Sequence, residues 1–157
     1  MNSESRVLIA EDSPTQAARL RFLLEGVGFA VTVATNGRAG LELARQVSPS
    51  IIISDVVMPE MDGYEFCRKV KLDPNLRDIP FVLLTSLSEI TDVIRGLECG
   101  ADNFLTKPYE ERHLLRRVGS MLSSFEVRQS SPATTGVEII FSGQQYVITS
   151  EIGRAHV

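Results

Sequence analysis

The stretch IIISDVVMPEMDG, residues Ile51 to Gly63, contains the pattern that decides the fold. Three β-branched apolar residues lead to Ser54 and then to the carboxylate of Asp55. An unbroken apolar run that ends near a turn residue such as Pro59 is typical of a strand buried on both faces of a sheet. Asp55 therefore comes at the end of a buried strand, where a charged group needs a partner.

The same pattern repeats along the chain, because short apolar runs alternate with segments whose apolar residues recur every three or four positions. The predicted strands are 6–10, 29–34, 50–55, 81–85 and 103–106. Predicted helices follow them, from Ser13-Pro14 to Gly26 and over 36–47, 62–72, 88–99 and 109–128. Five strand–helix units in succession predict an α/β fold, a flavodoxin-like (βα)5 three-layer sandwich with parallel strands in the order 2-1-3-4-5.

Composition places the chain among ordinary globular proteins. It has 157 residues, of which 43% are hydrophobic and 23% charged, and the net charge of −4 gives no general attraction to nucleic acid or to an anionic membrane. Cys67 and Cys99 have no CxxC partner or nearby His, so we expect reduced packing residues rather than a metal or redox site. The N-terminus does not have the pattern of a signal peptide, and no run approaches the ~18 apolar residues of a membrane span. We therefore expect a cytoplasmic protein.

Charged and polar residues collect where the predicted strands end. Glu11 and Asp12 follow the first strand, Asp55 ends the third, Thr85 ends the fourth, and Lys107 follows the fifth. Any one of them alone would be read as a solvated charge at a strand end. However, the carboxyl ends of parallel strands meet at one edge, and carboxylates brought close together repel one another. We therefore expect a bound cation, and ligands that are all hard oxygens favour Mg²⁺ over Zn²⁺.

Two other kinds of site fit this edge poorly. A flavin or nucleotide phosphate needs a turn with free backbone N–H groups, whereas the turn after the first strand is Glu-Asp-Ser-Pro, with two negative charges and a proline. A phosphatase of the Asp-x-Asp type is disfavoured as well, because Val56 and Val57 follow Asp55.

Taken together, these motifs resemble the receiver domains of bacterial two-component response regulators, over roughly residues 5–127. The matching pieces are Glu11-Asp12, Asp55 followed by MPEMDG, LLTS at 83–86 and GADNFLTKP at 100–108. Each piece alone is weak, but their order and spacing together are highly specific for the family.

The resemblance implies a phosphoacceptor role for Asp55, which would attack a phosphohistidine of a histidine kinase or phosphotransfer protein. Asp12 and Asp55 would bind Mg²⁺ directly, Glu11 would bind it through a water molecule, and the backbone carbonyl of Val57 would add a ligand. The chain would then be a signalling module, not an enzyme, that catalyses only its own phosphorylation and dephosphorylation.

The resemblance also implies a conformational switch. Lys107 would pair with one phosphoryl oxygen, and Thr85 would donate a hydrogen bond to another. The Lys107–Pro108 bond is expected to be cis, as is usual in the family. Phe104 would turn inward and reshape the face formed by the fourth helix, fifth strand and fifth helix, which could bind a partner or a second copy of the chain.

The resemblance further implies that two positions, Val57 and Leu87, set the lifetime of the phosphoryl group. Both are apolar and neither can orient an attacking water molecule, so slow self-dephosphorylation is expected. The changes Val57→Asn and Leu87→Glu should accelerate it.

The last predicted helix carries a small basic cluster of Arg112, Arg116 and Arg117, together with His113. Such a cluster is more often a solvated or dimer-contact face than a nucleic-acid patch, so direct nucleic-acid binding is not expected. His113 lacks the surrounding motif of a kinase phosphohistidine and is expected to be a simple surface residue.

The C-terminal part suggests further organisation. We expect a receiver domain over 1–127, a Ser/Thr/Pro-rich linker over 128–136 and a β-hairpin over 137–150 that begins a truncated downstream region. This hairpin resembles the beginning of the downstream region in hybrid sensor kinases that have an N-terminal receiver. Residues 151–157, EIGRAHV, match a translated sequencing-library adapter and are expected to be an artefact.

Three contexts for the receiver remain open at this point. It is either the receiver of a longer regulator, the N-terminal receiver of a hybrid histidine kinase, or a stand-alone single-domain regulator. The hairpin argues against the last of these, because a lone hairpin is not independently stable. A DNA-binding regulator would need a helix-turn-helix downstream, and the sequence shows no such motif.

Overall fold

The computed structural model describes residues 5–86, 90–130, 136–141 and 144–149. The strands are β1 (Arg6–Ala10), β2 (Ala30–Ala34), β3 (Ile51–Asp55), β4 (Phe81–Thr85), β5 (Asn103–Thr106), β6 (Gly136–Phe141) and β7 (Gln144–Thr149). The helices are α1 (Pro14–Gly26), α2 (Gly37–Val47), α3 (Gly63–Leu72), α4 (Ile90–Glu98) and α5 (Glu111–Ser130). Within the described ranges, none of these helices has the length and apolar character needed to cross a bilayer.

The first three helices begin at N-cap residues that the sequence indicates. Ser13 Oγ accepts a hydrogen bond from the backbone N–H of Gln16 at 3.3 Å, and Pro14 occupies the first helical turn. Asn36 caps α2 and Asp62 caps α3 in the same way, with N–H to oxygen distances of 2.8 and 2.9 Å. Each cap satisfies a backbone donor that the first turn leaves unpaired, and so it fixes where the helix starts.

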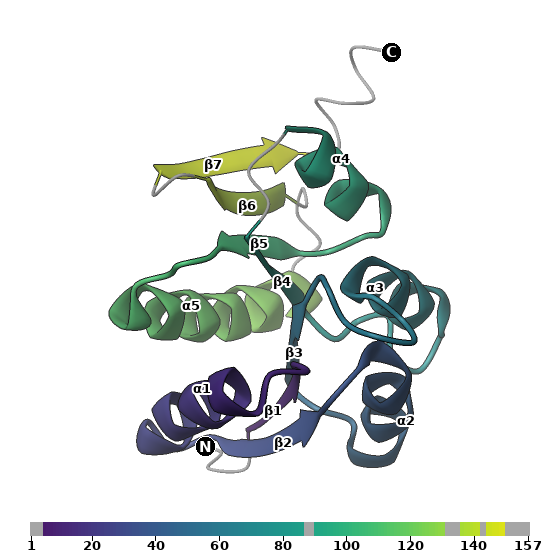
Figure 1. Ribbon diagram of the computed structural model, residues 1–157. Coiled ribbons are helices and arrows are strands. Elements are labelled where there is room, and N and C mark those ends of the chain that lie inside the picture. The colour runs from purple at the N-terminus through teal and green to yellow at the C-terminus, as the bar shows by residue number, and fades with distance from the viewer. Residues whose placement is uncertain (1–4, 87–89, 131–135, 142–143, 150–157) are drawn as a thin grey trace.

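The first five strands are parallel and lie in the order β2-β1-β3-β4-β5, which confirms the predicted order. β3 lies at the centre of this set, with Ile52 beside Leu8 of β1 and Ile53 beside Val82 of β4. Helices α1 and α5 cover one face of the sheet, and α2 and α3 cover the other (Figure 1).

Each face of the sheet has its own hydrophobic core. Leu8, Ile52 and Leu83 point to the core shared with α2 and α3. Ile9 and Ile53, one residue further along their strands, point to the core shared with α1 and α5. These side chains are fully buried, so the isoleucines before Asp55 are held from both sides and fix the end of β3 in place.

The sheet continues beyond β5, which the sequence did not predict. β6 pairs in parallel with β5, and β7 pairs antiparallel with β6, giving a seven-stranded sheet. β6 lies beside β5, and β7 lies beyond β6 at the end of the sheet (Figure 1). Helix α5 runs to Ser130, through the boundary expected between receiver and linker at 127/128.

Both cysteines are free and buried, with exposed fractions of 0% for Cys67 and 2% for Cys99. The Cys67 thiol donates to the backbone carbonyl of Cys99 at 3.4 Å, and the Cys99 thiol donates to that of Gly96 at 2.9 Å. Burial raises the pKa of the Cys67 thiol, which keeps it protonated. The expectation of reduced packing residues agrees with this geometry.

The basic cluster on α5 is less exposed than expected. Arg112 and Arg116 are exposed, but Arg117 is buried, with only 8% of its surface accessible. The expectation of a solvated face was therefore wrong for Arg117, which lies on the same side of α5 as the buried Leu114 and Val118.

Candidate functional site

Three carboxylates meet at the carboxyl edge of the sheet. Glu11 and Asp12 follow β1, and Asp55 ends β3, the neighbouring strand. One oxygen from each residue lies within 4.8 Å of the others. Within this group of three carboxylates, Glu11 is buried, with only 4% of its surface exposed, whereas Asp12 is open to solvent. Such a cluster of oxygen ligands could hold a divalent cation.

Lys107 supplies positive charge to this cluster. Its Nζ lies 3.2 Å from Asp55 Oδ2 and 3.5 Å from Glu11 Oε1, and it donates to Gln16 Oε1 at 3.0 Å. The Lys107–Pro108 peptide bond is cis, as expected, and the Lys107 N–H donates to the carbonyl of Thr85 at 2.7 Å. The ammonium group offsets part of the repulsion among the carboxylates.

The loop after β3 fixes the carboxylate of Asp55. The backbone N–H of Val56 donates to Asp55 Oδ1 at 2.9 Å, and the N–H of Gly63 donates to the Val56 carbonyl at 2.8 Å. A Cβ atom at Gly63 would lie 2.2 Å from the carbonyl oxygen of Asp55, a distance that no side chain can tolerate. Glycine at the start of α3 therefore allows the loop to fold back against the site.

Burial is the main reason why the pKa of Glu11 is raised above its ordinary value. The negative charge of Asp55 raises it further, while the N–H of Ser13, which donates to Glu11 Oε2 at 3.1 Å, and the charge of Lys107 lower it. The net upward shift means that the site binds a proton more readily than an isolated glutamate does. A divalent cation at the site would favour the charged form instead.

The two predicted switch residues lie on neighbouring strands. Thr85 ends β4, is 7% exposed and pairs with Thr106 at the end of β5. Phe104, in the middle of β5, is 2% exposed. Its ring packs against Gly96 of α4, because a Cβ atom there would come within 1.9 Å of Phe104 Cε2.

Of the two residues predicted to set the lifetime of the phosphoryl group, only Val57 lies within the described part of the chain. Val57 is 66% exposed and lies next to the acidic cluster in sequence, two residues after Asp55. Leu87 lies outside the described residues.

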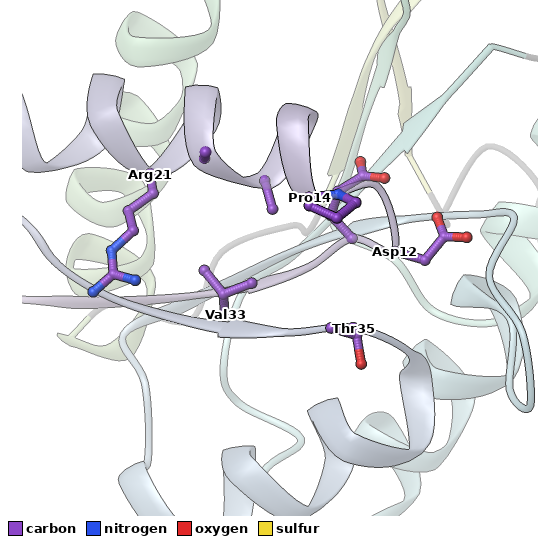
Figure 2. A pocket seen from close by; sticks show the side chains of 8 residues that line it. Asp12, Pro14, Arg21, Val33 and Thr35 are labelled. Atoms are coloured by element: carbon purple, nitrogen blue, oxygen red, sulfur yellow. The ribbon is translucent and has the colours of Figure 1, made fainter.

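A hollow of about 280 Å³ lies beside the acidic cluster, between α1 and β2. Figure 2 shows Asp12 and Pro14 at one end of this hollow and Arg21 at the other, with Val33 of β2 on the wall opposite α1. Its walls are mostly apolar.

The family model of the response regulator receiver domain matches residues 7–119. The chain belongs to this family. RpaA of Synechocystis, a DNA-binding dual master transcriptional regulator, is 38% identical over 117 residues, 74% of this chain and 48% of RpaA. The response regulator PleD of Caulobacter vibrioides is 42% identical over 117 residues, 74% of this chain and 26% of PleD. This receiver chain thus spans about half of RpaA and about a quarter of PleD.

Solved structures of receiver domains have the same fold. The receiver of a signal transduction histidine kinase from Syntrophus aciditrophicus is 49% identical and has a TM-score of 0.73, with 76% of this chain and 91% of that chain covered. The receiver of sensor histidine kinase PA1611 from Pseudomonas aeruginosa is 25% identical and has a TM-score of 0.72. The match covers 76% of this chain and 98% of the PA1611 chain. That structure is described as having a magnesium ion coordinated in its active-site cleft.

The structure brings four of the predicted site residues together, Glu11, Asp12, Asp55 and Lys107. Gln16 was not among the predicted site residues, but its side chain accepts a hydrogen bond from Lys107 at 3.0 Å. The supporting glycines, 63 and 96, were not singled out either. Their roles depend on contacts between segments far apart in sequence, and no local pattern signals such contacts.

Proposed function

We propose that Asp55 accepts a phosphoryl group from a phosphohistidine of a histidine kinase or phosphotransfer protein, the partners with which receiver domains interact. The observation that carries this proposal is the arrangement around Asp55, whose carboxylate lies within 4.8 Å of two other carboxylates and 3.2 Å from the ammonium of Lys107. An Asp55 oxygen would attack phosphorus, the P–N bond would break, and the histidine nitrogen would keep the electron pair.

Mg²⁺ fits the acidic cluster, and its charge would stabilise the oxygens of the transferring phosphoryl group. Asp12 and Asp55 would bind it directly, Glu11 through water, and the carbonyl of Val57 would complete the set. The donor set supports this assignment, because carboxylates, a carbonyl and water are the ligands that Mg²⁺ prefers. The exposed position of Asp12 and Val57 would let the ion keep several of its waters.

Lys107 and Thr85 would hold the phosphoryl oxygens after transfer. Their place beside Asp55 supports these roles, since Lys107 already contacts its carboxylate and the carbonyl of Thr85 accepts from the Lys107 backbone. Movement of these groups would reach Phe104 on β5 and change the face formed by α4, β5 and α5. The two apolar residues Val57 and Leu87 would leave the phosphoryl group long-lived.

The hairpin after α5 bears on the kind of protein to which this receiver belongs. Because the hairpin that follows α5 pairs with β5, it no longer argues against a stand-alone module. A receiver of a longer regulator in the cytoplasm, the N-terminal receiver of a hybrid histidine kinase and a stand-alone single-domain regulator all fit it. A homodimer through the α4–β5–α5 face would need the edge of β5, where β6 already pairs. The negative net charge favours a protein partner over nucleic acid.

Phosphotransfer to Asp55 can be tested with the small donor acetyl phosphate. The wild type should gain one phosphoryl group in the presence of Mg²⁺ and very little after chelation, as measured by intact mass. Asp55→Asn should gain none, whereas the control Asp78→Asn, at an exposed carboxylate, should label like the wild type. Equal labelling of the wild type and Asp55→Asn would overturn the assignment.

A further inference from the structure

The outer edge of β5 is occupied by the chain's own C-terminal hairpin. The register places Asn103 beside Glu138, Phe104 beside Ile139 and Leu105 beside Ile140, with β7 pairing on the far side of β6. An edge strand presents unpaired N–H and C=O groups that favour the addition of another strand. Here β6 pairs with that edge and lies beside β5 (Figure 1), although α5 and residues 131–135 separate the two strands in sequence.

The same β5 carries groups that belong to the acidic site. Lys107 follows directly after its last residue, and Thr106 pairs with Thr85 across the β4–β5 ladder. The backbone of Lys107 is also bonded to the carbonyl of Thr85. β5 therefore lies between the phosphoryl-binding groups and β6, so a displacement of Lys107 or Thr85 acts on the strand that holds the hairpin.

The middle of β5 adds a second link. Phe104 packs its ring against Gly96 of α4, while its backbone position pairs with Ile139 of β6. A rotation or shift at Phe104 thus changes its fit to α4 and its pairing with β6 at the same time. Both links converge on one strand of four residues, from Asn103 to Thr106.

We propose that the β6–β7 hairpin is an internal ligand of the β5 edge and that phosphorylation of Asp55 loosens it. This inference rests on the proposed function, since it takes Asp55 as the phosphoacceptor. A backbone hydrogen bond near 2.9 Å is lost when it lengthens by about 0.6 Å, so a small shift of β5 toward the site is enough to weaken its pairing with β6. The loosened hairpin uncovers the edge of β5.

Coupling of this kind is reciprocal. If phosphorylation weakens the pairing of β6 with β5, then weakening the pairing must favour the phosphorylated form by the same factor. Coupling between sites in proteins is typically about 5–150-fold, which sets the scale of the expected effects. The hairpin would therefore also restrain the site, and its release would make the site bind a phosphoryl group more tightly.

Hydrogen exchange on the full chain tests the forward effect, with beryllium trifluoride and Mg²⁺ as a stable mimic of the phosphoryl group. Amides of β6 should exchange at least about fivefold faster with the mimic bound, while amides of the central strands β1 and β3 keep their protection. Unchanged or slower exchange in β6, in a protein that acetyl phosphate labels on Asp55, would overturn the coupling and leave the proposed function intact. Failure of that labelling would instead overturn the proposed function, and the inference with it.

A proline in β6 tests the reverse effect. Ile139→Pro removes a backbone donor from the strand, whereas the matched control Ile139→Val keeps the backbone unchanged. The proline variant should bind beryllium trifluoride with Mg²⁺ at least about fivefold more tightly than the wild type, and the valine variant should match the wild type. Equal affinity in the proline variant and the wild type, with the β1 and β3 amides still protected, would overturn the proposal.

Discussion

At the scale of single residues, the positive charge of Lys107 reduces the repulsion among the carboxylates that the fold brings together. Its Nζ contacts Asp55 and Glu11, and only about a fifth of its side chain is exposed. Lys107→Met should lower the free energy of unfolding by about 1–2 kcal/mol without Mg²⁺ at pH 7, less than at a fully buried pair because the site is partly solvated. Urea unfolding measures this loss, and Lys69→Met, at an exposed position, is the control.

Mg²⁺ should restore part of that stability, since it brings positive charge to the same carboxylates. The stabilisation produced by saturating Mg²⁺ should therefore be larger in Lys107→Met than in the wild type. Equal stabilisation of the two proteins would show that Lys107 and the cation do not act on the same charges.

Glu11 gives the site its own pH dependence. Its raised pKa means that the metal-free folded chain holds this proton more tightly than the unfolded chain does, so the contribution of Glu11 to stability is greatest below its ordinary pKa of 4.5 and declines as the pH rises. Mg²⁺ needs the charged form, so the sign reverses when the metal binds.

The increase in Tm caused by Mg²⁺ should therefore grow as the pH rises, over a range that extends above the 4.5 of an ordinary glutamate. Thermal unfolding with and without Mg²⁺ from about pH 4 to pH 8 measures this dependence. In Glu11→Gln the increase should be smaller and should follow only the titration of the remaining carboxylates. An identical pH profile in this variant would remove Glu11 from the metal site.

At the scale of secondary-structure elements, the contact between α4 and β5 depends on one glycine. The Phe104 ring occupies the space where a Cβ atom of Gly96 would lie, while Gly119 of α5 has nothing within 4 Å of its own Cβ position. Alanine favours a helix over glycine by about 1 kcal/mol. At Gly96, however, it must push the aromatic ring away from α4, an overpacking that typically costs about 1–3 kcal/mol.

Gly96→Ala should therefore destabilise the protein by about 1 kcal/mol net, whereas Gly119→Ala should stabilise it by up to about that amount. Chemical denaturation of the two variants measures the difference. Adding Phe104→Leu should make Gly96→Ala less harmful, because the smaller side chain leaves room for the new methyl group. Equal effects of alanine at both glycines would mean that Phe104 does not depend on Gly96 for its place.

At the scale of the whole molecule, the sequence predicted the central architecture well. Apolar runs predicted the five strands and helical periods the five helices. Three of the predicted helix starts, at Ser13, Asn36 and Asp62, are N-cap residues in the structure. The site could also be predicted from the sequence, because residues at the carboxyl ends of parallel strands must converge once the strand order is known. These features follow from local patterns and from rules of topology.

The features that escaped prediction arise from contacts between distant segments. The pairing of β6 with β5 has no local signal, since the same hairpin sequence would suit a separate downstream domain equally well. The burial of Arg117 depends on how α5 packs in the fold, and the hydrogen bond from Lys107 to Gln16 joins the segment after β5 to α1. Each of these requires the tertiary structure before it can be seen.

The buried cysteines offer a way to measure local opening of the fold. Cys67 and Cys99 lie between α3 and the end of α4, with almost no accessible surface, so a thiol reagent reaches them only when these elements separate. The rate of modification under native conditions should then follow the opening equilibrium of this part of the fold. A ligand that stabilises this part of the fold should slow that reaction in proportion, so thiol modification measures the effect of Mg²⁺ without any added label.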